Sequence, residues 1–383
     1  MEAVTQRLAE LLELLAARDE VQGALLALPM DPGILEKAAA LFEARDFAAG
    51  EVLVEEAAED VDLVLWIVEG EADAQARPHT VDGRAGEPQR VGRLEPLDVV
   101  GEIGLVMRTR RSATVLARTP IRALAIRRDP LAELLGVHAA LATALVRWCA
   151  QNAAAKLVRT RRMHEEEVPM GLAVRDGPRV QATAMLAHDY APADADRQYA
   201  APGPRTTAKV LTRLGELRCF DWDTADLTPQ IAAHFHLVSV PARRAILSEG
   251  ELGDTLLIMS RGIANIRQRD GELVHGWVAG HLRSVHTLVG EMAFLNPGTR
   301  SGTVLAATPC ELLEIAAGDL PALVGVAPRV AQLLHLGVLR AVCPKLVETS
   351  LYRATIEAVA QGDWEQWFVD DDYYTRKLKA LDM

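Results

Sequence analysis

The first half of the chain changes its hydrophobic periodicity twice. Leucines and alanines recur at helical spacing through residues 4–17, and a second helix is predicted to start at Pro32, with Asp31 as its N-cap. From Phe47 onward, short apolar runs alternate with Gly and Pro, which predicts a small sandwich of many short strands. Helical periodicity then returns and continues to about Arg162.

The second half repeats this order after a polar stretch. Residues 165–204 are rich in Gly, Pro and Asp, which predicts a linker with a hairpin at 176–178. A short helix follows, residues 237–316 are strand-like, and helical spacing runs through 319–362. The order helix, strands, helix therefore occurs twice.

A seventeen-residue stretch is also written twice. It reads GEIGLVMRTRRSATVLA in the first half and GEMAFLNPGTRSGTVLA in the second. Glu291 follows Glu102 by 189 positions, and Arg300 follows Arg111 by the same step. A duplicated module of about 130 residues explains both the echo and the repeated order of elements.

These patterns divide the chain into five parts. The boundaries are N-terminal helices at 1–30, a first module at 31–162, a linker at 163–215, a second module at 216–350, and a C-terminal helix with an acidic, aromatic tail at 351–383. The N-terminal leucine stripe either joins two copies of the chain or caps the first module.

Composition narrows the class of protein. Half of the 383 residues are hydrophobic, which suits packed cores, and the formal charge of −12 argues against a protein that coats nucleic acid. No apolar run approaches the ~18–20 residues of a membrane span, and the N-terminus lacks the features of a signal peptide. Four scattered cysteines indicate reduced thiols, so we expect a cytoplasmic protein; they are Cys149, Cys219, Cys310 and Cys343.

The repeated stretch places a carboxylate and a guanidinium at opposite ends of a tight loop. Backbone N–H groups of a short turn or helix start hold a phosphate, an arginine neutralises it, and a glutamate accepts from a ribose hydroxyl. The pair therefore suits a sugar phosphate. The alternative is that Glu102 and Arg111, like Glu291 and Arg300, salt-bridge one another in an empty fold.

Both modules resemble the cyclic nucleotide-binding domain, a family that includes regulatory subunits of cyclic-AMP-dependent kinase and catabolite activator proteins. The resemblance implies an α+β protein with two β jelly rolls in tandem, each flanked by helices, and a hinge helix that closes over the bound base. The family's phosphate-binding cassette corresponds to positions that the resemblance implies bind ligand: Gly101, Glu102, Ile103, Arg111 and Ser112, then Gly290, Glu291, Met292, Arg300 and Ser301.

The modules depart from the family pattern in places. The glycine of an early turn is Ala57 in the first module, whereas the second keeps Gly250. The family's Gly-Asp ahead of the cassette is Leu97-Asp98 in the first module. Both Glu–Arg pairs are nevertheless intact.

The identity of the ligand is left open by the sequence. The family implies cAMP or cGMP, and Ser112 and Ser301 do not distinguish adenine from guanine. Arg108 and Arg110 are either solvated turn residues or admit a cyclic dinucleotide. Trp148, on the helix after the first roll, either caps a base by stacking or packs in the core.

Other motifs have more ordinary interpretations. His234-Phe235-His236 resembles a cupin metal motif without its glutamate, so neither a metal site nor an enzyme is expected. The basic stretch at 159–167 is a solvated helix end or a kinase-inhibiting segment. The tail at 363–383 docks a partner or packs on the second roll, and the residues after Val342 are too few and too acidic for a helix-turn-helix.

The sequence thus predicts a non-catalytic cyclic nucleotide sensor or regulatory subunit with no cofactor. Ligand in one or both rolls would reposition the following helices and change a surface for an unknown protein partner or a second copy of the chain. The alternative is a scaffold or assembly protein that retains the rolls without a ligand.

Overall fold

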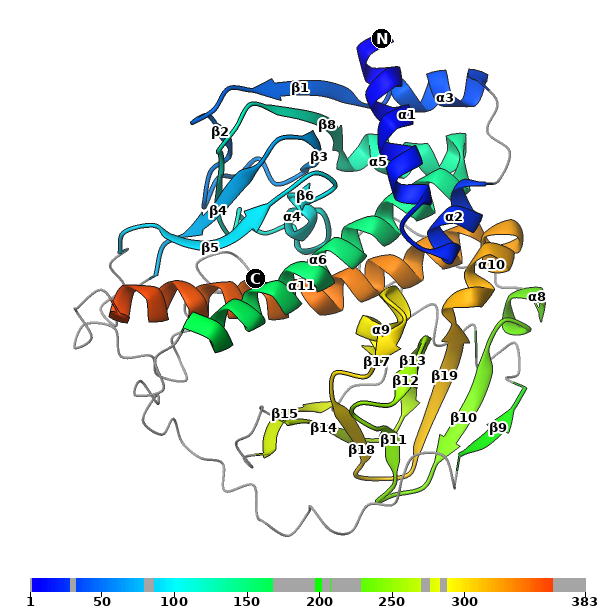
Figure 1. Cartoon of the computed structure of the whole chain (residues 1–383). Coiled ribbons are helices and arrows are strands. Elements are labelled where there is room, and N and C mark those ends of the chain that lie inside the picture. The colour runs from blue at the N-terminus through cyan, green and yellow to red at the C-terminus, as the bar shows by residue number, and fades with distance from the viewer. Residues whose placement is uncertain are drawn as a thin grey trace. The chain divides into compact units, whose positions relative to one another are not determined.

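The computed structural model describes residues 2–27, 32–78, 86–167, 197–201, 207, 229–269, 276–282 and 288–360. The chain forms two compact units, each containing one β roll (Figure 1). Unit 1 combines Met1–Gly177 with Leu339–Met383, and unit 2 is Pro178–Val338. Asp31, the hairpin at 176–178 and the tail at 363–383 lie outside the described residues.

Three helices open unit 1: α1 (Glu2–Ala16), α2 (Glu20–Leu26) and α3 (Pro32–Ala39). The leucine stripe of α1 is buried, and the helix contacts strands of the first roll, so the stripe caps that roll. Arg7 fixes the helix there, because its Nη1 donates to the carbonyl of Ala123 at 3.0 Å and its Nη2 pairs with Asp46 at 2.7 Å. Asp19 caps α2 by accepting from the amide of Gln22.

The first roll consists of two antiparallel four-stranded sheets. The first sheet has the order β1 (Glu43–Phe47), β8 (Ile121–Arg127), β3 (Leu63–Glu69) and β6 (Val99–Val100). The second has the order β2 (Val52–Val54), β7 (Thr114–Ala117), β4 (Ala72–Ala76) and β5 (Gln89–Leu94). Apolar side chains from both sheets meet in one core.

The burial of strand β3 shows that the first sheet has to be covered by helices on the face that turns away from the roll. Its first five residues are all buried, which requires cover on both faces of the strand. Leu65 and Ile67 belong to the core of the roll, whereas Trp66 meets Phe42 with ring centroids 6.1 Å apart.

Helices follow in unit 1: α4 (Glu102–Met107), α5 (Arg128–Val137) and α6 (Ala139–Glu167). Helix α6 contacts β5, β6 and α4, so it lies along the start of the cassette.

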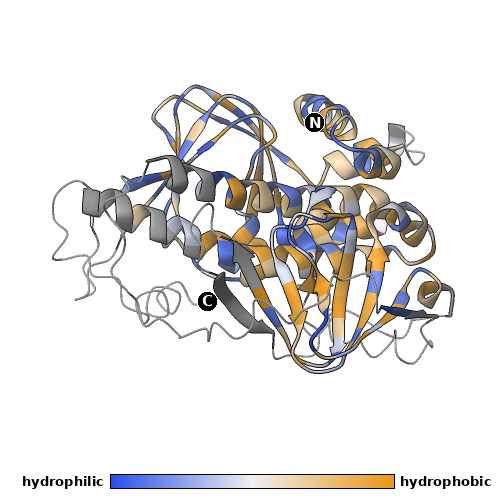
Figure 2. Ribbon diagram, turned by 60° about the horizontal axis from the view of Figure 1, so that its bottom comes forward, coloured by the Kyte–Doolittle hydropathy of each residue, from blue (hydrophilic) through white to orange (hydrophobic). Residues whose placement is uncertain are grey.

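Unit 2 repeats the strand order of the two sheets of the first roll and has additional strands. One sheet has the order β16 (Leu288–Val289), β13 (Thr255–Arg261), β19 (Cys310–Ala316), β10 (His236–Val240) and β9 (Gln198–Ala200). The other has the order β11 (Ala245–Leu247), β18 (Thr303–Ala306), β14 (Ala264–Arg269) and β15 (Gly276–Leu282), with β12 (Leu252–Gly253) and β17 (Gly298–Thr299) as a separate pair. Figure 2 shows apolar colour along several strands of this roll, and β13 and β19 are buried along most of their length.

The remaining helical elements are α8 (Pro229–Ala232), α9 (Glu291–Leu295), the 3₁₀ helix η4 (Ala317–Asp319), α10 (Leu320–Val326) and α11 (Pro328–Ala360). The stretch Pro328–Val347 of α11 meets the length and mean hydropathy of a membrane span, whereas the sequence analysis expected no apolar run of that length. Of this stretch 78% is buried inside the protein, as is usual for a helix that packs in a protein core.

The two rolls also agree at their unusual backbone positions. Ala57 and Gly250 both have left-handed φ angles, of 64° and 83°. Their amides donate to the carbonyls of Arg111 and Arg300 at 2.8 and 2.9 Å. The predicted equivalence of these two turns, and with it the tandem jelly-roll fold, is confirmed.

Candidate functional site

Each cassette begins at a glycine with left-handed φ, 96° at Gly101 and 82° at Gly290. A Cβ atom at Gly101 would lie 2.4 Å from Nη1 of Arg111, and one at Gly290 would lie 2.6 Å from Nη1 of Arg300. Glycine therefore serves two purposes here: it allows the turn, and it lets the guanidinium pack against the backbone.

Arg111 is a buried cation with an unfilled donor. Only 5% of its surface is exposed, and its Nη2 donates to the carbonyl of Leu63 at 2.9 Å. Among the described residues, its Nη1 has no hydrogen-bond partner and no carboxylate forms an ion pair with it. Burial lowers the pKa of Arg111, against the opposing effect of Asp60 and Glu102. A charge left this way is costly, so the position favours an anion.

Arg300 occupies the same place in unit 2 with more hydrogen bonds. Its Nη1 donates to the carbonyls of Thr255 and Gly290 at 2.9 and 3.1 Å, and its Nη2 donates to Oγ1 of Thr255 at 2.9 Å. Its Nε has no partner among the described residues, and the side chain is 5% exposed. Burial lowers the pKa of Arg300 as well.

The two glutamates are buried too, Glu102 at 3% and Glu291 at 7% exposure. Oε1 of Glu102 lies 2.8 Å from Nζ of Lys156, which comes from α6 and also donates to the carbonyl of Val99. The salt bridge of Glu102 is therefore made with α6, in place of the bridge to Arg111 that the sequence analysis considered.

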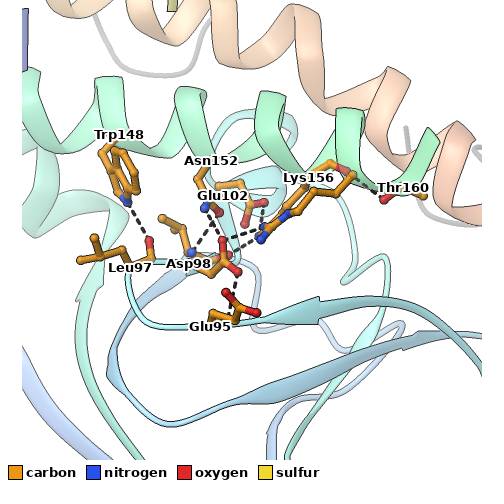
Figure 3. A network of polar contacts seen from close by, with 10 residues as sticks. Glu95, Leu97, Asp98, Glu102, Trp148, Asn152, Lys156 and Thr160 are labelled. Atoms are coloured by element: carbon orange, nitrogen blue, oxygen red, sulfur yellow. Dashed lines mark hydrogen bonds and ion pairs between the residues drawn. The ribbon is translucent and has the colours of Figure 1, made fainter. Parts of the chain in front are cut away.

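A row of polar side chains on α6 extends this contact (Figure 3). Asp98 accepts from Asn152 at 2.5 Å and from Arg159 at 2.8 Å, and Asn152 in turn accepts from the amide of Val99 at 3.0 Å. Trp148 donates from its indole to the carbonyl of Leu97 at 2.7 Å. Since residues three and four apart share a helix face, one face of α6 holds both the turn before the cassette and the cassette itself.

Comparison with known proteins identifies this architecture. Residues 44–138 and 237–325 each match the family model of the cyclic nucleotide-binding domain. Each of these two segments is a cyclic nucleotide-binding domain, so the chain contains two copies in tandem. No curated protein matches the chain.

Several solved structures resemble the chain at low sequence identity. The regulatory domain of Toxoplasma gondii PKA with cAMP is 16% identical, with 86% of this chain and 95% of that chain covered and a TM-score of 0.28. The regulatory subunit of a cAMP-independent protein kinase A from Trypanosoma brucei is 19% identical, with coverages of 86% and 87% and a TM-score of 0.28. A cyclic nucleotide-binding domain from Methylobacillus flagellatus is 16% identical, with coverages of 44% and 90% and a TM-score of 0.35.

Sequence reasoning missed the lysine that holds the first cassette glutamate. The duplication carried a signal for it, because the step of 189 positions leads from Lys156 to Lys345. The same step leads from Asn152 to Ala341 and from Arg159 to Glu348. The cation is thus repeated in both copies of the tandem domain, whereas the polar residues around Asp98 belong to the first copy.

The other predicted site residues are more exposed. Ile103, Met292 and Ser112 are partly buried, and Ser301 is exposed.

The basic turn and the tryptophan of the first cyclic nucleotide-binding domain have local partners. Arg110 pairs with Glu59 at 3.4 Å on the surface, and Arg108 ends α4 in a left-handed conformation. Trp148 is 6% exposed, and the guanidinium of Arg18 lies 5.2 Å from the centroid of its ring. These contacts fit the packing role for Trp148 that the sequence analysis set beside base stacking.

Cysteine and metal chemistry add little to the site. Cys149, Cys310 and Cys343 are buried and form no disulfide among the described residues, and burial raises the pKa of Cys149 and Cys310. Within the described part of the chain, no group of three or more His, Cys, Asp or Glu side chains is placed to hold a metal ion.

Proposed function

We propose that the chain is a non-catalytic cyclic nucleotide sensor or regulatory subunit. In this proposal cAMP or cGMP places its phosphate at Arg111, Arg300 or both, and its ribose at the corresponding Glu102 and Glu291. The observation that carries the proposal is the buried arginine in each cassette, which has an unfilled N–H donor and no ion pair with a described carboxylate.

Binding would supply a partner to cassette groups that have none among the described residues. A phosphate oxygen at Arg111 accepts from the unfilled Nη1 and neutralises the guanidinium, which burial otherwise disfavours. The first-turn amides of α4, which have no helical acceptor, add donors beside it. The same two features recur at Arg300 and α9.

Lys156 supports a route from ligand to α6. A ribose hydroxyl that donates to Glu102 shares the carboxylate with Lys156, so ligand changes how firmly α6 holds the cassette. Ligand shifts α6 from one position to another only to the extent that it binds the protein more tightly with α6 in the second position. The changed α6 surface would act on a protein partner or on a second copy of the chain.

A ligand-free scaffold is the second candidate. It is favoured by the internal partners that several site groups already have: Lys156 for Glu102, and three hydrogen bonds for Arg300. A roll stabilised in this way holds its shape without nucleotide. The two candidates therefore differ in whether nucleotide binds at all.

Calorimetric titration with cAMP, cGMP and a cyclic dinucleotide separates the candidates. The sensor predicts heat and a thermal shift with at least one of them, and the ratio of affinities identifies the base. Absence of both signals with all three ligands, in a folded protein, rejects the sensor and favours the scaffold.

Arginine variants assign the sites. Arg111→Met and Arg300→Met should each remove the binding of their own module and leave the other module's stoichiometry intact. Arg122→Met is the matched control, because Arg122 forms an exposed ion pair with Glu69 in unit 1 and takes no part in the cassette. Binding that survives the double variant Arg111→Met/Arg300→Met would contradict the assignment.

A further inference from the structure

Unit 1 contains a small apolar cluster separate from the core of its roll. Ala76 of β4 and Val91 of β5 are buried in it, with Ala74 and Ala113 packed at its edge. We call these four residues the alanine wall. Among the described residues, Ala354 of α11 packs against the wall, and it is 0% exposed. This part of α11, drawn in orange to red, runs past β4 and β5 in Figure 1.

The alanine wall adjoins the first cassette. Ala113 follows Arg111 by two residues. The pairing of Gln75 with Thr114 places β4 directly beside β7, the strand that follows Arg111 in the cassette. An extended chain spans about 3.3–3.6 Å per residue, so the wall begins within about 7 Å of Arg111 along the backbone. That is within the length of one nucleotide, from phosphate to base.

A second observation ties the wall to a ligand. Arg111 is 5% exposed and its Nη1 has no partner among the described residues, so an anion is expected beside the wall. A nucleotide held there needs an apolar surface for its base, since ligand sites combine apolar walls with a few fixed polar groups. The alanine wall supplies such a surface.

The fit of Ala354 leaves no room for that base. Ala354 and Ala76 are both 0% exposed, and Val91 is 4% exposed. Close packing of small side chains brings the backbone of α11 near the strands, and an aromatic ring is too thick to enter without displacing the helix. Ala354 and a base on the wall therefore exclude one another.

We infer that nucleotide and α11 compete for the alanine wall of the first module. The inference rests on the proposed function and adds its regulation: α11 lowers the nucleotide affinity of the first module, and bound nucleotide displaces α11 around Ala354. Because such coupling is reciprocal, loosening α11 strengthens nucleotide binding by the factor with which nucleotide loosens α11.

Disulfide trapping in the full chain tests the docking without assuming a ligand. Ala76→Cys/Ala354→Cys and Val91→Cys/Ala354→Cys, each in a Cys219→Ser background, should cross-link under mild oxidant at least about tenfold faster than Val52→Cys/Ala354→Cys. Val52 is an exposed residue of the same roll outside the wall. Cross-linking of both pairs at the control rate would overturn the inference.

Nucleotide then tests the competition. In an Arg300→Met background, which confines binding to the first module, saturating cAMP or cGMP should slow the cross-linking about tenfold. Ala354→Glu, which places a charge against the wall, should raise first-module affinity about tenfold. Fast cross-linking that bound nucleotide does not slow would overturn the competition. A third outcome is fast cross-linking in a chain that binds no nucleotide, either as the parent or as Ala354→Glu. That result would overturn the competition because the proposed function itself had failed, and only the docking of α11 on the wall would stand.

Discussion

Glu102 and Lys156 lie 54 positions apart in the sequence and 2.8 Å apart in the fold, where they join the cassette of the first module to α6. The carboxylate side chain is 3% exposed and the lysine 14%, so water screens the pair poorly. The contact that holds the cassette against α6 is thus the one that a ribose hydroxyl at Glu102 would disturb.

We expect Lys156→Met alone to destabilise unit 1 by about 3 kcal/mol, because it leaves a buried carboxylate without its cation. Lys156→Met/Glu102→Gln should recover much of the loss, since both charges are then removed. Urea unfolding combined with hydrogen exchange of peptides from α4 and α6 measures the effect in this unit.

An ion pair on the surface is the control for the double-mutant cycle of Lys156 and Glu102. Arg45 and Glu43 form an ion pair of similar length, 2.7 Å, with side chains 39% and 55% exposed. Their double-mutant cycle should give less than about 1 kcal/mol. Equal coupling energies for the two pairs would contradict the buried character of Glu102–Lys156.

The fold was accessible from the sequence because its signals are local and occur twice. Period-two runs predict the strands, and the equivalent turns at Ala57 and Gly250 share left-handed φ angles. The repeated step of 189 positions then aligns the sequence of one roll with that of the other. By contrast, β9 lies in the predicted linker, and its pairing with β10 depends on tertiary contact that no local pattern encodes.

The site could be predicted from the sequence only in part, because the sequence signals are local. Gly-Glu and Arg at fixed spacing predict the cassette, but they do not show which partner each charge meets. Lys156 lies in a helix whose periodicity is dominated by packing, so its contact with Glu102 follows from the approach of α6 to β6. The contact of Ala354 with the alanine wall likewise joins residues more than two hundred positions apart.

Gly101→Ala tests the close approach of the arginine. A Cβ there would lie 2.4 Å from both Nη1 of Arg111 and the carbonyl oxygen of Leu63, and φ is 96°. We expect a loss of unit 1 stability larger than backbone strain alone, which is about 1–2 kcal/mol, together with weakened nucleotide binding. Differential scanning calorimetry and titration measure the two effects.

Gly50→Ala is the matched variant for this substitution. Gly50 has φ of 86° in the same roll, and nothing lies within 4 Å of the place that a Cβ atom would occupy. It should therefore show the strain without the crowding and bind nucleotide as the parent does. Equal losses at Gly50 and Gly101 would show that both Arg111 and the Leu63 carbonyl move aside freely.

Ala57→Gly should stabilise unit 1 slightly. Ala57 has φ of 64°, and relief of about 1–2 kcal/mol of left-handed strain outweighs the 0.4–1 kcal/mol or so that glycine costs through the unfolded chain. The reciprocal change, Gly250→Ala at φ of 83°, should destabilise unit 2. Thermal unfolding of both variants checks the pair, and a loss of stability in Ala57→Gly would contradict the interpretation.

We expect the charge of Asp98 to make the contact between α6 and the turn before the cassette sensitive to acid. Burial acts to raise the pKa of Asp98, but Lys156, Arg159 and Asn152 outweigh it and hold the pKa below its ordinary value of 3.8. A carboxyl whose pKa is lowered by folding contributes stability that is present above the unfolded pKa and is lost as pH falls through the folded one. The contribution of Asp98 is therefore constant between pH 5 and 8 and declines below about pH 4.

Asp98→Asn isolates this contribution, because it removes the charge and keeps a side chain of the same shape. The variant should be less stable than the parent at pH 7, and the difference between them should shrink as pH falls below 4. Hydrogen exchange of α6 peptides at pH values from 3 to 7, corrected for the intrinsic exchange rate, follows the difference where it arises. A difference that stays constant over this range would mean that Asp98 holds α6 through its shape and hydrogen bonds, with no contribution from its charge.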